Sequence, residues 1–141
     1  MKSDLLRRDW QPTPTIPAAA YVHIPFCAKK CGYCDFNAYS GYKDGTKQRY
    51  VDAICHEIAT RGAGGKPLTS VFFGGGTPTQ LPTEALVRIL DTLRETLGIA
   101  PNAEITLEAN PNDVMLHDWI ALRAGGVNRV SFGVLSFNPD V

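Results

Sequence analysis

Three cysteines lie within eight positions of one another, in the stretch YVHIPFCAKKCGYCDFN. They are Cys27, Cys31 and Cys34, with the spacing C-x3-C-x2-C. Thiolates are soft ligands that suit zinc and iron–sulfur clusters. A structural zinc ion takes four ligands, and His23 is the side chain nearby that could supply the fourth. A cubic 4Fe-4S cluster could instead be held by three thiolates, leaving one iron open to a small chelating molecule.

Composition and charge limit the kind of protein that carries these thiols. The chain has 141 residues, 44% of them hydrophobic, with 14 basic and 14 acidic side chains, as expected for one globular domain. A net charge of zero provides no general attraction to nucleic acid. We expect no transmembrane segment and no export signal, because apolar runs are short and the N-terminus is charged. A cytoplasmic location follows, in which clustered cysteines bind metal rather than form disulfides.

Strand and helix signals alternate along the chain after an extended, proline-containing leader over residues 1–18. The patterns predict strands over residues 19–26, 68–76, 104–111 and 128–137. They predict helices over residues 46–61, 84–98 and 113–126, with Thr83 as N-cap of the second and Gly98 at its end. Cys55, within the first helix, is expected to be a small buried residue. This order predicts an α/β fold with a parallel sheet, either a barrel or a doubly wound sheet.

The residues that could do chemistry follow the predicted strands. Cys27 follows the first strand, Gly74–Gly76 follow the second, and Glu108 lies near the end of the third. Because the carboxyl ends of parallel strands share one edge of a sheet, these residues are expected to converge. Glycines would let a ligand approach the backbone, although a tight turn would explain them equally well. Glu108 could likewise be no more than a solvated carboxylate at a strand end.

The cysteine spacing, with an aromatic residue before the last cysteine, resembles the signature of the radical S-adenosylmethionine (SAM) enzymes. The resemblance implies a 4Fe-4S cluster on Cys27, Cys31 and Cys34, with SAM on the open iron and a reductant for the cluster. It implies further SAM contacts, which are Gly75, Gly76, Thr77 and Glu108. For the fold it implies the N-terminal portion of a partial (β/α) barrel of the radical SAM type over residues 19–141. We expect that domain to continue beyond the chain end, because the last strand would otherwise be an apolar unpaired edge.

Four motifs narrow the resemblance: YVHIPFCxxxCxYCDFN, FFGGGTPT, LEANP and GVNRVSFGV. Together they resemble the oxygen-independent coproporphyrinogen III oxidase-like family over about residues 20–138. The resemblance places Tyr21 near the cluster and SAM, and Tyr33 against the adenine of SAM, although either ring could simply be packed. For His23 we expect packing or a backbone hydrogen bond rather than catalysis. The family pattern has Gln where this chain has Leu135.

Two branches of that family differ beside the third cysteine. The oxidase pattern is C-x3-C-x2-C-x-C, whereas Phe36 stands at the position of its last cysteine here. The sequence CDFN resembles the heme-chaperone branch, which binds heme and transfers it to acceptor proteins. We therefore expect a heme chaperone, with its heme site outside this chain. The alternative is an oxidoreductase of porphyrin biosynthesis that decarboxylates two propionates of coproporphyrinogen III.

Overall fold

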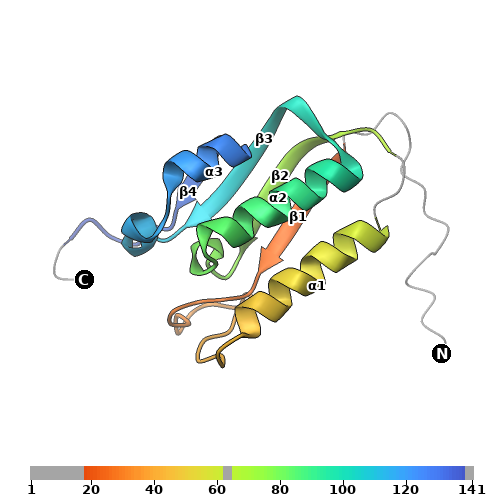
Figure 1. Ribbon diagram of the computed structural model, residues 1–141. Coiled ribbons are helices and arrows are strands. Elements are labelled where there is room, and N and C mark those ends of the chain that lie inside the picture. Colours follow the sequence, from red (N-terminus) through yellow and green to blue (C-terminus); the bar gives the residue numbers. More distant parts are fainter. Residues whose placement is uncertain (1–17, 62–64, 139–141) are drawn as a thin grey trace, which may run out of the picture.

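The computed structural model describes residues 18–61 and 65–138, which alternate between strand and helix (Figure 1). The strands are β1 (Ala18–Ile24), β2 (Leu68–Gly75), β3 (Ile99–Ala109) and β4 (Arg129–Phe132). The α-helices are α1 (Thr46–Arg61), α2 (Thr83–Leu97) and α3 (Trp119–Gly125), and two 3-10 helices are η1 (Pro78–Gln80) and η2 (Pro111–Leu116). The leader expected over residues 1–18 lies outside the described residues except for Ala18, which begins β1. Among the described residues, no helix has the length and apolar character needed to cross a bilayer.

The sheet has the order β1-β2-β3-β4, and every neighbouring pair of strands is parallel. Figure 1 shows the three α-helices on the same side of this sheet, with α1 packed on α2 and α2 on α3. A doubly wound sheet carries helices on both faces, whereas a (β/α) barrel keeps them all outside. This arrangement confirms the predicted α/β class. It also agrees with part of a (β/α) barrel rather than with a doubly wound sheet.

The hydrophobic core lies between the sheet and the helices. Alternate strand residues point into it, among them Ile24, Phe73 and Leu107, and α2 contributes the fully buried Ile89 and Leu90. Cys55 of α1 is buried in the same cluster, as predicted. The intervening strand residues point to the opposite face, which no described helix covers; they include Tyr21, His23, Phe72, Glu108 and Ser131.

The boundaries of some helices and strands differ from the predictions. At the start of α2, a side chain forms hydrogen bonds with a distant segment. Thr83 is the first residue of α2 and not its N-cap, which is Pro82. The Thr83 hydroxyl lies 3.1 Å from Nδ1 of His117 and accepts a hydrogen bond from the Asp118 amide. These contacts occupy the hydroxyl that an N-cap would use for its own helix. Gly98 ends α2 with a φ of 73°, as predicted.

The third predicted helix is wrong in its first half. Residues Pro111–Leu116 form η2, and α3 begins only at Trp119, after the N-cap Asp118. Asn110 caps η2 by accepting from the Asn112 amide, and Asp118 accepts from the Ala121 amide. Two capping side chains thus divide a stretch whose apolar spacing alone fits one helix. The third strand begins five residues earlier than predicted, at Ile99, and the fourth ends at Phe132 rather than at residue 137.

Candidate functional site

The loops after the strands lie toward one end of the sheet (Figure 1). Residues of these loops and of the strand ends line a pocket of about 270 Å³. Seven of the nine residues predicted as cluster or SAM contacts line it, namely Cys27, Cys31, Cys34, Gly75, Gly76, Thr77 and Glu108. Ser131, Phe132 and Gly133 complete the wall from the end of β4. Four strand ends therefore contribute to one pocket, because parallel strands bring their carboxyl ends to the same edge of the sheet.

The cysteine loop follows β1, and its two ends are joined by backbone hydrogen bonds. The Cys27 amide donates to the carbonyl of Tyr39, and the Tyr39 amide donates to the carbonyl of Pro25, at 2.9 and 2.7 Å. The side chain of Phe26 is buried beneath this closure. A third hydrogen bond, from the Cys34 amide to the Cys31 carbonyl, closes the turn that carries the last two thiols. All three thiols are free and reach the pocket from this one loop.

The glycine segment, Gly74–Thr77, overlaps the end of β2 and lies directly against the end of β1. The Gly76 amide donates to the Ile24 carbonyl and the Thr77 amide donates to the Phe26 carbonyl, both at 2.7 Å. A Cβ on Gly76 would lie 2.8 Å from the Phe26 oxygen, and one on Gly75 would lie 2.6 Å from the His23 ring. Gly75 also has a φ of 113°, which side-chain-bearing residues rarely adopt. Close packing within the protein thus requires these glycines, in addition to any approach by a ligand.

Glu108 projects from β3 beside the glycine segment. A Cβ on Gly74 would lie 2.7 Å from the Phe72 ring and 2.9 Å from Oε2 of Glu108, so the ring and the carboxylate share the space that this glycine leaves. Burial, with a smaller contribution from the charge of Glu108, raises the pKa of the Tyr21 hydroxyl. Tyr21 and Glu108 therefore face the same uncovered side of the sheet, although Tyr21 does not line the cysteine pocket.

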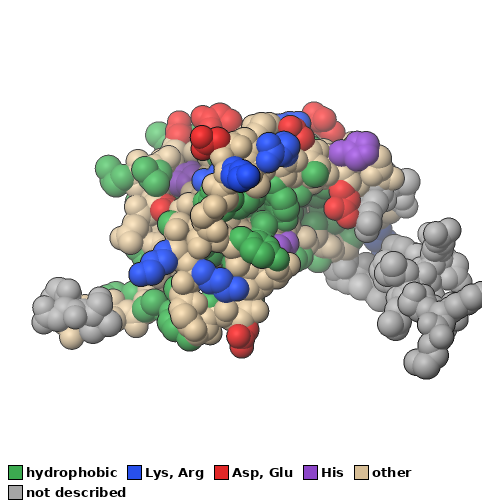
Figure 2. Space-filling view, turned by 90° about the horizontal axis from the view of Figure 1, so that it is seen from below, with side chains coloured by type: hydrophobic (Ala, Val, Ile, Leu, Met, Phe, Trp, Pro, Cys, Tyr) green, Lys and Arg blue, Asp and Glu red, His purple; other side chains and the backbone are tan. Residues whose placement is uncertain are grey.

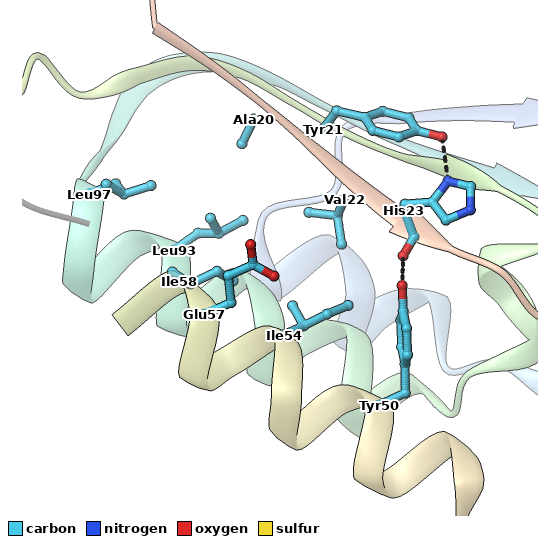
Figure 3. Close-up of a pocket in the computed structure, with 10 residues that line it drawn as sticks. All are labelled: Ala20, Tyr21, Val22, His23, Tyr50, Ile54, Glu57, Ile58, Leu93 and Leu97. Atoms are coloured by element: carbon cyan, nitrogen blue, oxygen red, sulfur yellow. Dashed lines mark hydrogen bonds between the residues drawn. The ribbon is translucent and has the colours of Figure 1, made fainter. Parts of the chain in front are cut away.

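Tyr21 lines a second hollow, of about 360 Å³, along β1 and α1 (Figure 3). The Tyr21 hydroxyl lies 3.1 Å from Nδ1 of His23, and the Tyr50 hydroxyl donates to the His23 carbonyl at 2.7 Å. Dashed lines mark both contacts in Figure 3. His23 Nε2 lies 2.9 Å from the carbonyl of Asn37 and must be the donor there, which leaves Nδ1 to accept from Tyr21. The backbone hydrogen bond expected for His23 is confirmed. Neither ring nitrogen is free to serve as a fourth zinc ligand.

The outer rim of the cysteine loop is aromatic. Tyr33 is 71% exposed, and a hydrogen bond with Cys31 is the main cause that raises the pKa of its hydroxyl. Phe36, which also lines the pocket, is 68% exposed. Figure 2, seen from below relative to the view of Figure 1, shows hydrophobic side chains beside Lys and Arg side chains on that face. Tyr33 lies outside the pocket, so the structure places it beside the thiols rather than within the cavity.

The donor set fits a cluster better than a single ion. Within residues 18–61 and 65–138, no three His, Cys, Asp or Glu side chains come close enough together to hold one metal ion. A zinc site gathers its sulfurs around one point at Zn–S distances of about 2.3 Å. A cluster of four irons spreads three thiolates around a larger body, and here they line a pocket whose remaining wall is glycine backbone and one carboxylate.

Several polar residues behind the pocket were missed from the sequence. The buried Asp113 accepts hydrogen bonds from Thr79 and Gln80, and Thr79 also accepts from the Asn110 amide. The dipeptide Asn110-Pro111 does signal a turn, and an acidic residue soon after it could have drawn attention. Nothing in the local pattern shows that its partners lie more than thirty residues away.

Comparison with known proteins gives consistent matches. The model of the Radical SAM superfamily matches residues 21–141. The heme chaperone HemW of Synechocystis sp. is 45% identical over 137 residues, which cover 92% of this chain and 32% of that protein. HemW of Escherichia coli is 38% identical over 126 residues, covering 88% of this chain and 33% of that protein. HemW of Bacillus subtilis is 40% identical over 126 residues, covering 87% and 33%. The chain spans about a third of the length of these curated relatives.

A solved structure is similar as well. It is that of the coproporphyrinogen III oxidase HemN from Escherichia coli, a radical SAM enzyme, with a TM-score of 0.83 and 37% sequence identity. The match covers 91% of this chain and 30% of that one. The predicted fold type is confirmed by this likeness.

Proposed function

The chain belongs to the Radical SAM superfamily, and on that premise we propose that it binds a 4Fe-4S cluster and SAM within a heme chaperone. Iron–sulfur clusters and SAM are general to this superfamily. The type of cluster, its ligands and the heme function are the proposal. Residues 19–141 would form the N-terminal part of the core domain of a cytoplasmic protein that interacts with a reductant, with heme and with heme-accepting proteins.

Cys27, Cys31 and Cys34 would hold the cluster, since all three thiols reach one pocket from one loop. When bound and reduced, such a cluster would be the electron donor for SAM chemistry. The Thr77 hydroxyl, 3.7 Å from the Cys27 sulfur, can donate to the thiolate, and such hydrogen bonds tune cluster potentials.

The opposite wall of the pocket would orient SAM. Gly75, Gly76 and Thr77 present backbone without intervening side chains, apart from the small Thr77 hydroxyl, which suits the polar methionine end of SAM. The Glu108 carboxylate is an acceptor that can pair with an ammonium group or receive a hydroxyl hydrogen bond. Neither Tyr21 nor Tyr33 lines the pocket. Their proposed contacts with SAM therefore rest on the family resemblance alone.

One observation favours the chaperone over the oxidase. Phe36 lines the pocket at the position where the oxidase pattern has a further cysteine. The heme chaperones HemW cited above are 38–45% identical to this chain. The structural likeness to HemN supports the oxidase as the second candidate, because the fold is shared between the two.

Anaerobic reconstitution of the chain with iron and sulfide tests the cluster. We expect brown protein with equal iron and sulfide, in the amount of one 4Fe-4S cluster per chain. Uptake of zinc without sulfide would contradict the proposal. The second step needs a protein of the relatives' length that carries this chain: tight heme binding and transfer support the chaperone, whereas formation of protoporphyrinogen from coproporphyrinogen III would support the oxidase.

A further inference from the structure

A buried carboxylate lies behind the pocket without lining it. Asp113 is only 7% exposed, and it sits in η2, five residues after Glu108. Its Oδ2 accepts a 2.8 Å hydrogen bond from the Thr79 hydroxyl and a 3.2 Å hydrogen bond from the Gln80 side-chain amide. Both donors belong to η1, which directly follows the glycine segment. Asp113 therefore ties the loop after β3 to the loop after β2.

Thr79 uses its remaining polar atoms for the same purpose. It is 3% exposed, and its hydroxyl oxygen accepts from the Asn110 amide at 3.3 Å while its carbonyl accepts from Nε2 of His117 at 2.8 Å. Thr79 lies two residues after Thr77, and Asn110 lies two residues after Glu108. The contacts of Thr79 thus fix the separation between the two walls proposed to hold SAM.

Gln80 extends the network toward the cysteine loop. Its Oε1 accepts from the Tyr42 hydroxyl at 3.3 Å. The Tyr42 ring packs edge-on against Phe26, with ring centroids 4.9 Å apart, and Phe26 directly precedes Cys27. A chain of contacts therefore runs from Asp113 through Gln80 and Tyr42 to the base of the thiol-bearing loop.

We propose that Asp113 is a positioning residue for the SAM pocket: it holds the glycine segment against β3 and supports the base of the cysteine loop. This inference rests on the proposed SAM binding for its functional consequence. A carboxylate accepts both hydrogen bonds at one oxygen, and removing it leaves a buried hydroxyl and a partly buried amide without that partner. A loosened glycine segment would then bind SAM more weakly, although Asp113 itself does not line the pocket.

Amide hydrogen exchange of the metal-free chain tests the positioning directly. In Asp113→Ala we expect the amides of Gly76, Thr77 and Asn110 to exchange about tenfold faster or more. The core amides of Phe73 and Leu107 should keep their rates, because the change is local. Asp113→Asn retains a carbonyl acceptor and should restore slow exchange. Asp91→Ala, which removes an exposed carboxylate paired with Arg94 on α2, is the matched control and should change none of these rates.

The second measurement is SAM affinity of the reconstituted protein by calorimetry. We expect Asp113→Ala to weaken SAM binding about tenfold with unchanged iron and sulfide, and Asp113→Asn to stay close to the parent. Should Asp113→Ala fail to fold, Thr79→Val removes the same hydrogen bond at nearly constant volume and should give the same pattern.

Several outcomes would overturn the inference. They are equal acceleration of exchange throughout the sheet, no acceleration at the glycine segment, or an unchanged SAM affinity in Asp113→Ala. If the parent protein takes up no cluster and no SAM, the proposed function fails instead, and the exchange measurement alone still decides whether Asp113 positions these loops.

Discussion

The hydroxyl of Thr77 lies 3.7 Å from the sulfur of Cys27, and the two residues are 50 positions apart in the chain. The contact joins the last residue of the glycine segment to the first cysteine of the thiol loop. It exists because β1 and β2 are adjacent parallel strands that end side by side, with His23 paired to Gly74 and Ile24 to Gly75. The wall proposed to hold SAM and the thiol wall of the pocket are therefore joined by hydrogen bonds.

The four cysteines should divide into three ligands and one bystander. Replacing Cys27, Cys31 or Cys34 by Ala should abolish cluster uptake, because the loss of one thiolate leaves an iron uncoordinated. Cys55→Ala should leave iron and sulfide unchanged, since Cys55 is buried among core residues of α1 and the sheet. Iron and sulfide assays after reconstitution decide the matter, and equal iron loss in all four variants would refute the assignment.

Gly76→Ala should destabilise the metal-free chain. The added Cβ would meet the backbone oxygen of Phe26 at 2.8 Å, which a side-chain movement cannot relieve. Overpacking of this kind costs about 1–3 kcal/mol, measured here by urea unfolding. Gly32→Ala is the control, because nothing lies within 4 Å of its Cβ position. A loss of stability as large in Gly32→Ala as in Gly76→Ala would argue against the steric explanation.

Stability should decline at alkaline pH through Tyr50. Burial, with smaller effects from Glu57 and Tyr21, raises the pKa of its hydroxyl above 10.0. The unfolded chain releases this proton near pH 10, whereas the folded chain retains it to higher pH. The contribution of the protonated Tyr50 hydroxyl to the free energy of unfolding is therefore complete below that pH and is lost as pH rises through the folded pKa.

The variant Tyr50→Phe should therefore flatten the dependence of the unfolding free energy on pH above 10. At neutral pH it should lower that free energy by about 0.5–1.5 kcal/mol, because the hydrogen bond to the His23 carbonyl is lost. Urea unfolding at both pH values measures the two effects. Tyr39→Phe, on an exposed ring, serves as the control. An alkaline loss that persists unchanged in Tyr50→Phe would assign it to other groups.

Leu135→Gln should tighten SAM binding. By family resemblance, a Gln at this position could hydrogen-bond the SAM ribose, which Leu cannot do. Restoring the bond should improve affinity by about threefold to a hundredfold in a protein of the relatives' length. Leu135 is 78% exposed, which excludes the alternative that it is a core residue in this chain. The melting temperature should therefore hardly change, and calorimetry that finds no gain in affinity would reject the idea.

The chain should self-associate through β4. This strand is one of the two edges of the described sheet, and it is followed by the exposed Val134, Leu135 and Phe137, the last of which is 95% exposed. Unpaired strand edges with exposed apolar side chains favour association between copies. Light scattering should detect oligomers, and the double variant Val134→Lys, Phe137→Lys should shift the mass toward the monomer. A monomeric parent with sharp cooperative unfolding would contradict the prediction.

Much of the site was determined by sequence alone because its components follow local rules. The periods of apolar residues predict strands and helices in alternation, and alternation predicts a parallel sheet. Parallel strands bring their carboxyl ends to one edge, so the sequence alone predicts that Cys27, the glycine segment and Glu108 share one site.

Only the tertiary structure decided how those parts are held together. The hydrogen bonds of Asp113 with Thr79 and of Thr83 with His117 join residues 34 positions apart, and such pairs leave no periodic trace in the sequence. The contacts of Thr83 explain why it is not the N-cap of α2. The capping residues Asn110 and Asp118 explain why the third predicted helix is in fact two shorter helices, η2 and α3. Packing also supplied a reason for Gly76, whose missing side chain makes room for the backbone at Phe26. A side chain's partner depends on which segments the fold brings within hydrogen-bonding distance, and the local pattern carries no information about that distance.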